Sequence, residues 1–134
     1  MSLKAHHSAR CAVRSRERHT ILIVEDEVLI RLLAADDLRA RGFGVLEASN
    51  ADEAIAVLQS GAPIDLVFTD VRMPGSMDGF ALARFIHARR PELKLIITSG
   101  AALSSSPESD DVFIRKPYDL NLVVTRINDL FANH

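Results

Sequence analysis

Acidic residues follow two of the short apolar runs in this 134-residue chain, where a β-strand is expected to end. Glu25 and Asp26 follow residues 21–24, and Asp70 follows residues 66–69. Short runs of β-branched and large apolar residues predict buried strands, as in a parallel sheet. Carboxylates crowded at the carboxyl ends of such strands repel one another unless another charge neutralises them. A hard divalent cation, normally Mg²⁺, is the usual partner, so these residues are candidate metal ligands.

A lysine and a hydroxyl extend this set. Lys116 follows the apolar run 112–114, and Ser99 follows the run 93–98. Because the carboxyl ends of parallel strands form one ligand-binding edge, we expect all these groups to meet there. Acids that hold a divalent cation, together with an ammonium group that pairs with phosphate oxygens, favour the handling of phosphoryl groups.

Strand-like and helix-like segments alternate along residues 20–134, which predicts a doubly wound α/β fold: a five-stranded parallel sheet with helices on both faces. Asn50 and Glu53 predict a capping box at the start of one helix, and Gly42 and Gly61 predict helix ends. Predicted strands cover 21–24, 44–48, 64–69, 93–98 and 112–114, and predicted helices cover 28–41, 50–60, the stretch between the 72–79 loop and Pro91, and the stretch that Asp119 caps.

Composition excludes several classes of protein. The net charge is −2, with five basic residues and one acidic residue in positions 1–19, so the body of the chain is acidic and a poor nucleic-acid surface. No run approaches the roughly 20 apolar residues of a membrane span, and residues 1–19 contain no apolar stretch typical of a signal peptide. The single cysteine, Cys11, fits a cytoplasmic location. We expect residues 1–19 to form a solvated, flexible extension to the domain at 20–134.

Four motifs occur in order: Ile-Val-Glu-Asp-Glu at 23–27, Thr-Asp-Val-Arg-Met-Pro-Gly-Ser-Met-Asp-Gly at 69–79, Ile-Thr-Ser-Gly at 97–100 and Phe-Ile-Arg-Lys-Pro-Tyr at 113–118. Together they resemble the receiver domain of two-component response regulators, over residues 20–134. The resemblance implies a flavodoxin-like fold with strand order 2-1-3-4-5. It also implies that Asp70 is the phosphoacceptor, and that Asp26, Asp70 and the backbone carbonyl of Arg72 bind Mg²⁺. Glu25 would reach the metal directly or through water.

The same resemblance assigns the remaining site residues. Lys116 pairs with a phosphoryl oxygen, and the bond from Lys116 to Pro117 is cis. Ser99 corresponds to the switch hydroxyl and Phe113 to the aromatic switch position. The spacing from Ser99 to Phe113 is shorter than the family norm. The stretch 100–111 is rich in Ser and Asp and contains Pro107, so we expect the fourth helix to be shortened or missing.

Alternative interpretations remain open at three places. Glu25 and Asp26 could cap the following helix, because acids favour helix N-termini. Thr98 competes with Ser99 for the switch position, since adjacent strand residues point to opposite faces and only one can face the site. Phe113 could be a core residue alone.

The implied function is a phosphorylation switch that accepts a phosphoryl group on Asp70 from a histidine kinase or a histidine phosphotransfer protein and signals through protein contacts. We expect a stand-alone receiver, not an enzyme, with at most slow self-dephosphorylation. A phosphorelay intermediate or phosphate sink is the alternative. A haloacid-dehalogenase-like phosphatase is distant, because it needs a second Asp where this chain has Arg72. A nucleotide-binding protein is disfavoured because no glycine-rich phosphate loop is present.

Overall fold

The computed structural model describes residues 18–72, 77–100 and 111–132. The predicted basic extension lies outside these residues except for Arg18 and His19. The segment 101–110, where the sequence predicts a loop in place of a full helix, also lies outside them, as do 73–76 of the loop after Asp70.

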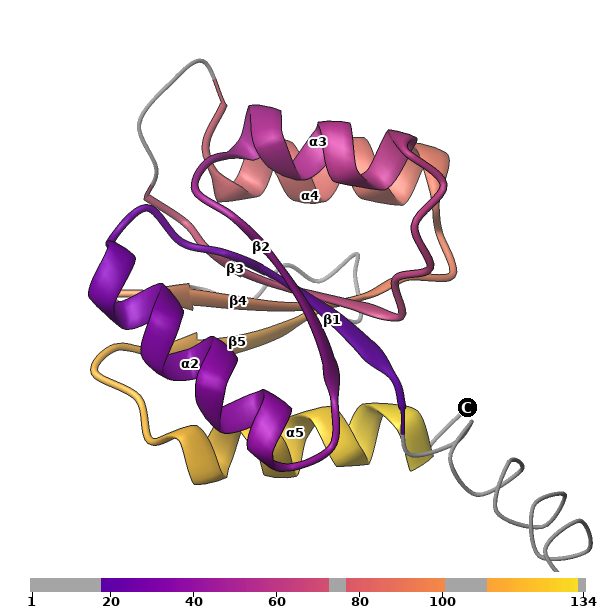
Figure 1. Cartoon of the computed structure of the whole chain (residues 1–134). Helices are drawn as coiled ribbons and strands as arrows, with labels where there is room; N and C mark the ends of the chain where they lie inside the picture. Colours follow the sequence, from indigo (N-terminus) through magenta and orange to yellow (C-terminus); the bar gives the residue numbers. More distant parts are fainter. Residues whose placement is uncertain (1–17, 73–76, 101–110, 133–134) are drawn as a thin grey trace, which may run out of the picture.

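Five parallel strands form the centre of the molecule, and the predicted fold class is confirmed (Figure 1). The strands lie in the order β2-β1-β3-β4-β5, so β1, β3 and β4 are flanked on both sides and β2 and β5 are the edges. Their bounds are Thr20–Val24 for β1, Gly44–Ala48 for β2, Leu66–Asp70 for β3, Lys94–Ser99 for β4 and Val112–Arg115 for β5.

Four helices in the described part of the chain cover the two faces of this sheet. In Figure 1, α3 and α4 lie over one face and α2 and α5 lie over the other. None of the helices described is long and apolar enough to cross a membrane. Their bounds are Val28–Ala40 for α2, Ala51–Gln59 for α3, Gly79–Arg89 for α4 and Leu120–Ala132 for α5.

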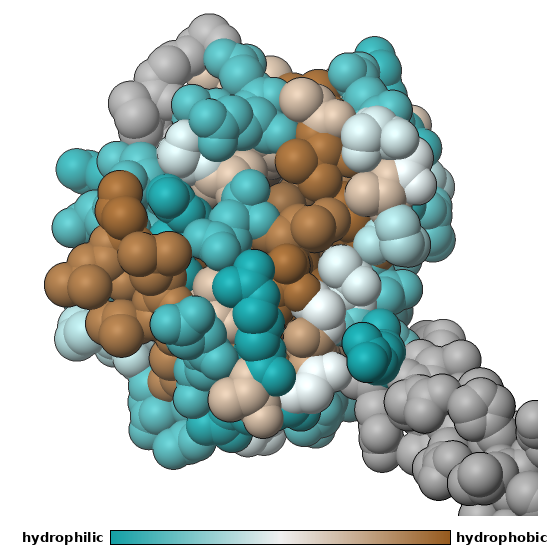
Figure 2. All heavy atoms as spheres, viewed as in Figure 1, coloured by the Kyte–Doolittle hydropathy of each residue, from teal (hydrophilic) through white to brown (hydrophobic). Residues whose placement is uncertain are grey.

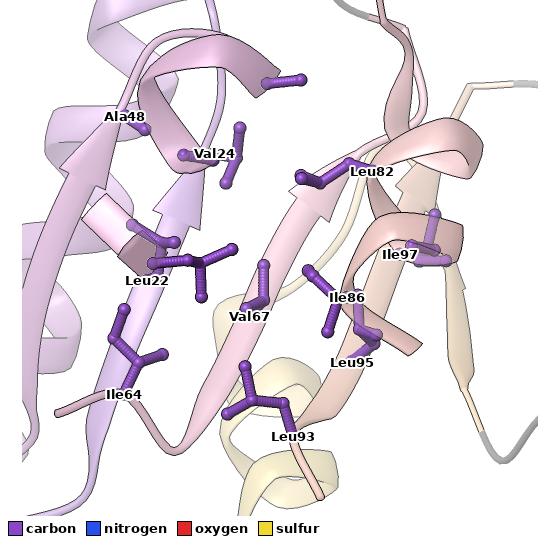
Figure 3. Close-up of a cluster of buried hydrophobic side chains, with 14 residues drawn as sticks. Leu22, Val24, Ala48, Ile64, Val67, Leu82, Ile86, Leu93, Leu95 and Ile97 are labelled. Atoms are coloured by element: carbon purple, nitrogen blue, oxygen red, sulfur yellow. The ribbon is translucent and has the colours of Figure 1, made fainter. Parts of the chain in front are cut away.

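Two hydrophobic cores result, because successive strand residues point to opposite faces and both faces are covered. Leu22, Val67 and Leu95 lie in the core under α3 and α4, where they meet Leu82 and Ile86 of α4 (Figure 3). The core on the other face is formed with α2 and α5. Each fully buried aliphatic side chain contributes about 1.5–3 kcal/mol relative to exposure, so these two cores dominate the stability of the fold. The second core contains Ile21, Ile23, Ala34, Ala35, Leu38, Leu66, Phe68, Ile96, Ile114, Val123 and Ile127.

Element boundaries follow the local signals with small corrections. Gly42 and Gly61 follow α2 and α3 with φ of 100° and 88°, a backbone conformation that favours glycine. The third strand begins at Leu66 and not at 64, although Ile64 is buried in the same core. The side-chain oxygen of Asn50 accepts a hydrogen bond of 2.8 Å from the N–H of Glu53, as predicted. The carboxylate of Glu53 accepts from the N–H of Ser49 and not of Asn50, one residue earlier than the capping box predicts.

The N-terminal half of α2 exposes an apolar surface. Leu29 is 68% exposed and Leu33 is 58% exposed, and Val28 and Leu32 are also exposed. Figure 2 shows this surface as a brown patch at the left, over α2. It lies close to the carboxyl end of β1, because α2 begins four residues after that strand ends.

The cap of α3 gives a stability prediction. Asn50→Ala removes the acceptor for the N–H of Glu53, so we expect the free energy of unfolding to fall by about 1 kcal/mol in urea denaturation followed by circular dichroism. Asn50→Asp keeps an acceptor and is expected to stay near the wild-type value. Equal losses in the two variants would contradict the assignment of this cap.

Candidate functional site

Three carboxyl groups meet at the carboxyl edge of the sheet. Oxygens of Glu25, Asp26 and Asp70 lie within 4.8 Å of one another. Glu25 is 5% exposed and Asp70 is 7% exposed, whereas Asp26 is open to solvent. The sequence prediction that these residues come together is therefore matched by the geometry, in which one acid is accessible and two are buried.

Lys116 bridges the two buried acids. Its Nζ lies 2.9 Å from Oδ2 of Asp70 and 3.2 Å from Oε1 of Glu25. The second oxygen of Glu25 accepts a hydrogen bond of 3.0 Å from the N–H of Glu27. The backbone N–H of Arg72 approaches Oδ1 of Asp70 at 3.4 Å. The cluster of three carboxyl groups thus contains one ammonium group, which binds two of them.

The burial of this cluster changes the proton affinity of its members. Burial raises the pKa of Glu25 above its usual value, and the charge of Asp70 adds to the effect, which the hydrogen bonds from Glu27 and Lys116 only partly offset. Burial alone would lower the pKa of Lys116, but the hydrogen bond to Asp70 and the charge of Glu25 outweigh it, and the pKa is raised. Lys116 is consequently a fixed positive charge at the site at neutral pH.

Backbone hydrogen bonds between neighbouring strands hold this edge together. The N–H of Glu25 donates to the carbonyl of Ala48 at the end of β2, at 3.0 Å. The N–H of Val71 donates to the carbonyl of Thr98 at 2.9 Å, and the N–H of Lys116 donates to the carbonyl of Ser99 at 2.8 Å. The pairing of the sheet therefore continues one residue beyond the end of β1, β3 and β5, and places the acids and the lysine side by side.

Thr98 and Ser99 are both buried and face opposite sides of the sheet. Ser99 pairs in register with Arg115, and Ile97 pairs with Phe113, so Ser99 and Phe113 share the face covered by α3 and α4. Thr98 lies on the other face. Phe113 packs against the α3/α4 core, and its ring centroid lies 6.4 Å from that of Phe80. Phe113 thus lies at the edge of the α3/α4 core, on the same side of the sheet as Ser99, the predicted switch hydroxyl.

The remaining predicted site residues lie around the same edge. Glu27 occupies the N-cap position of α2 without a side-chain cap hydrogen bond, and the carboxylate of Glu25 accepts from the N–H of Glu27. Arg72 follows β3 by two residues and is exposed. The peptide bond between Lys116 and Pro117 is cis.

Two residues at this edge were missed by sequence reasoning. Arg31 of α2 donates from Nη1 to the backbone carbonyl of Glu25 at 2.8 Å. Gly79 donates to the carbonyl of Val71 at 2.8 Å, and a Cβ at Gly79 would overlap the carbonyl of Asp70 and lie 2.8 Å from the Cα of Val71. Arg31 has no distinguishing motif of its own. The Asp-Gly pair that ends the second motif was a signal for Gly79, but the reason for a glycine needs the structure.

Comparison with known proteins agrees with this geometry. The model of the response regulator receiver domain matches residues 21–128. The chain belongs to this family. It is 32% identical over 117 residues to the sensor kinase CckA of Brucella abortus, covering 83% of this chain and 12% of that protein. It is 30% identical over 123 residues to the transcriptional regulator NtrC of Salmonella typhimurium, covering 88% of this chain and 26% of that protein. The chain therefore spans only 12% and 26% of the length of these two relatives.

Solved receiver structures superimpose on the chain over most of its length. A response regulator receiver protein from Sinorhizobium medicae gives a TM-score of 0.80 at 31% identity, over 87% of this chain and 96% of that one. The receiver domain of the hybrid histidine kinase CckA gives 0.73 at 35% identity, over 84% and 98%. The response regulator TrrA of Thermotoga maritima, whose structure contains Mg²⁺ and BeF, gives 0.74 at 28% identity, over 84% and 98%.

The close approach of Gly79 to Asp70 gives a second prediction. Gly79→Ala forces a methyl group against the backbone of Asp70, so we expect it to lower the free energy of unfolding by about 1–3 kcal/mol, as overpacking does. The matched control is Gly100→Ala, where the space around the added Cβ is open, and we expect a change within about 0.5 kcal/mol. Urea denaturation measures both, and equal effects would contradict the steric argument.

Proposed function

We propose that this receiver domain accepts a phosphoryl group on the carboxylate of Asp70 and that phosphorylation changes the protein contacts it makes. The observation that carries the proposal is the Lys116 bridge between Asp70 and Glu25, set among three carboxyl groups whose oxygens lie within 4.8 Å of one another. Family membership supports the same assignment.

The chemical step follows from these groups. A carboxylate oxygen of Asp70 attacks the phosphorus of a phosphohistidine, the phosphorus–nitrogen bond breaks, and the leaving nitrogen takes a proton. The product is an acyl phosphate. Lys116 already lies 2.9 Å from an oxygen of Asp70, so its ammonium group can pair with an oxygen of the incoming phosphoryl group.

The donor set fits a divalent cation. Three carboxyl groups face a single ammonium group, so the ionised cluster has an excess of negative charge, and hard oxygen donors suit Mg²⁺. Asp26, Asp70 and the backbone carbonyl of Arg72 would hold the ion, with Glu25 directly or through water. When bound, Mg²⁺ offsets charge on the oxygens of the transferring phosphoryl group. The metal in the related TrrA structure supports this assignment.

The switch is assigned to Ser99 and Phe113. Both lie on the α3/α4 side of the sheet, which supports a coupled movement in which the hydroxyl of Ser99 turns toward the phosphoryl group and the ring of Phe113 turns inward. Thr98 lies on the other side, next to the α2/α5 core. On this account Ser99, and not Thr98, is the switch hydroxyl.

The phosphodonor is a histidine kinase or a histidine phosphotransfer protein, and the domain acts in the cytoplasm. The phosphodonor reaches Asp70 at the carboxyl edge of the sheet, where the exposed leucines of α2 offer an apolar surface that it can bind. A phosphorelay intermediate or phosphate sink remains the alternative output, and back-transfer of the phosphoryl group to a histidine phosphotransfer protein would favour it. Residues 20–134 form the receiver domain in this proposal, and residues 1–19 are an extension.

Asp70→Asn tests the acceptor. With acetyl phosphate and Mg²⁺, we expect the wild-type protein to gain the mass of one phosphoryl group and Asp70→Asn to gain none, as measured by intact-protein mass spectrometry. The exposed Asp36 of α2 provides the control, because Asp36→Asn changes the net charge equally and should be labelled like the wild type. Labelling of Asp70→Asn at the wild-type level would refute the assignment.

Ser99→Ala and Thr98→Val separate the two candidate switch hydroxyls. Beryllofluoride with Mg²⁺ is expected to shift the aromatic NMR signals of Phe113 in the wild type and in Thr98→Val. Ser99→Ala should lose that shift, because it lacks the hydroxyl that would turn toward the bound beryllofluoride. The reverse pattern would assign the switch to Thr98.

A further inference from the structure

Arg31 of α2 links three parts of the acidic edge. Its guanidinium group donates from Nη1 to the backbone carbonyl of Glu25 at 2.8 Å and from Nε to the carboxylate of Glu47 at 3.2 Å. Its side chain is only 16% exposed. Glu47 belongs to β2, so one side chain connects the second turn of α2, the edge strand and the turn that carries the acids.

With the hydrogen bond from Arg31 to its carbonyl, every polar group of Glu25 has a partner. The N–H of Glu25 is bound to the carbonyl of Ala48, and the carboxylate of Glu25 is bound by Lys116 and by the N–H of Glu27. The carbonyl of Glu25 belongs to the peptide group that it shares with Asp26. Asp26 is exposed, so the orientation of its carboxylate depends on that peptide group.

We infer that Arg31 is a positioning residue: its guanidinium group fixes the peptide group between Glu25 and Asp26 and so holds both carboxylates in the arrangement that binds Mg²⁺. This inference rests on the proposed function in one respect, that the acidic cluster binds Mg²⁺. Residues that orient metal ligands typically change metal affinity by about 10–100-fold when they are replaced.

Loss of Arg31 removes both its positive charge and its hydrogen bond to the carbonyl of Glu25, and these two losses change the affinity for Mg²⁺ in opposite directions. The positive charge of Arg31 repels Mg²⁺ at the acidic cluster. Removing that charge alone would therefore tighten the binding of Mg²⁺. Removing its hydrogen bond to the carbonyl of Glu25 frees the turn and would weaken the binding. The direction of the change therefore separates the two effects.

Arg39 provides a matched control within the same helix. It also donates to a backbone carbonyl, that of Val45 at 3.1 Å, and to the same Glu47 carboxylate, at 3.3 Å. Replacing either arginine leaves Glu47 with one partner, so neither variant strands an unpaired carboxylate. The difference is that the carbonyl bound by Arg39 lies in β2, away from the acids.

The experiment measures Mg²⁺ affinity by following the backbone amide NMR signals of residues 25–27 during titration of the full chain. We expect Arg31→Gln to weaken the binding by about tenfold, and Arg39→Gln to match the wild type. Arg31→Lys keeps the charge, but a lysine lacks the planar guanidinium group that binds both the carbonyl of Glu25 and the carboxylate of Glu47. It should therefore also weaken the binding of Mg²⁺, but by less than Arg31→Gln. If Arg31→Gln does not fold, Arg31→Lys decides by the same comparison.

A second readout is the Mg²⁺ dependence of labelling by acetyl phosphate. Arg31→Gln should need more Mg²⁺ for half-maximal labelling and reach the wild-type rate at saturation. Unchanged or tighter Mg²⁺ binding in the Arg31 variants, or an equal loss in Arg39→Gln, would overturn the inference while the proposed function stands. Weaker binding in Arg31→Gln, with no labelling of the wild-type Asp70, would overturn the proposed function alone. A wild-type protein that binds no Mg²⁺ would overturn both.

Discussion

The structure is organised around electrostatic crowding at one edge of a parallel sheet. Burial of Glu25 and Asp70 raises the free energy of their charged forms, and Lys116 relieves this only in part, as the raised pKa of Glu25 indicates. Such a cluster persists because two hydrophobic cores hold the strands that carry it. The two cores stabilise the fold, and the acidic cluster lies at the carboxyl edge of the sheet.

The architecture was predictable from sequence because most strands are short apolar runs and several helix ends carry local signals. Asn50 and the glycines at 42 and 61 mark helix ends through interactions that depend on few neighbours. The convergence of Glu25, Asp26 and Asp70 was predictable for a topological reason, since parallel strands all end at one edge. The start of the third strand was misplaced because Ile64 is as apolar as the strand that follows it.

Other features of the site depend on distances that periodicity does not encode. Arg31 reaches Glu25 across the turn between β1 and α2, and Gly79 fits against Asp70 only because the two chain segments approach closely. The resemblance predicts Ser99 as the switch hydroxyl, but strand alternation alone separates Thr98 from Ser99 without saying which of them shares a face with Phe113. The register of β4 and β5 supplies that information.

Neighbouring residues of β4 belong to different halves of the molecule. Ser99 and Ile97 lie in the half beneath α3 and α4, and Thr98 lies in the half beneath α2 and α5. Phe113 therefore lies on the same side of the sheet as Ser99, whereas the helix that carries Arg31 covers the other side. The carboxyl edge joins the two halves, because Lys116 binds the carbonyl of Ser99 through its N–H and the carboxylate of Glu25 through Nζ.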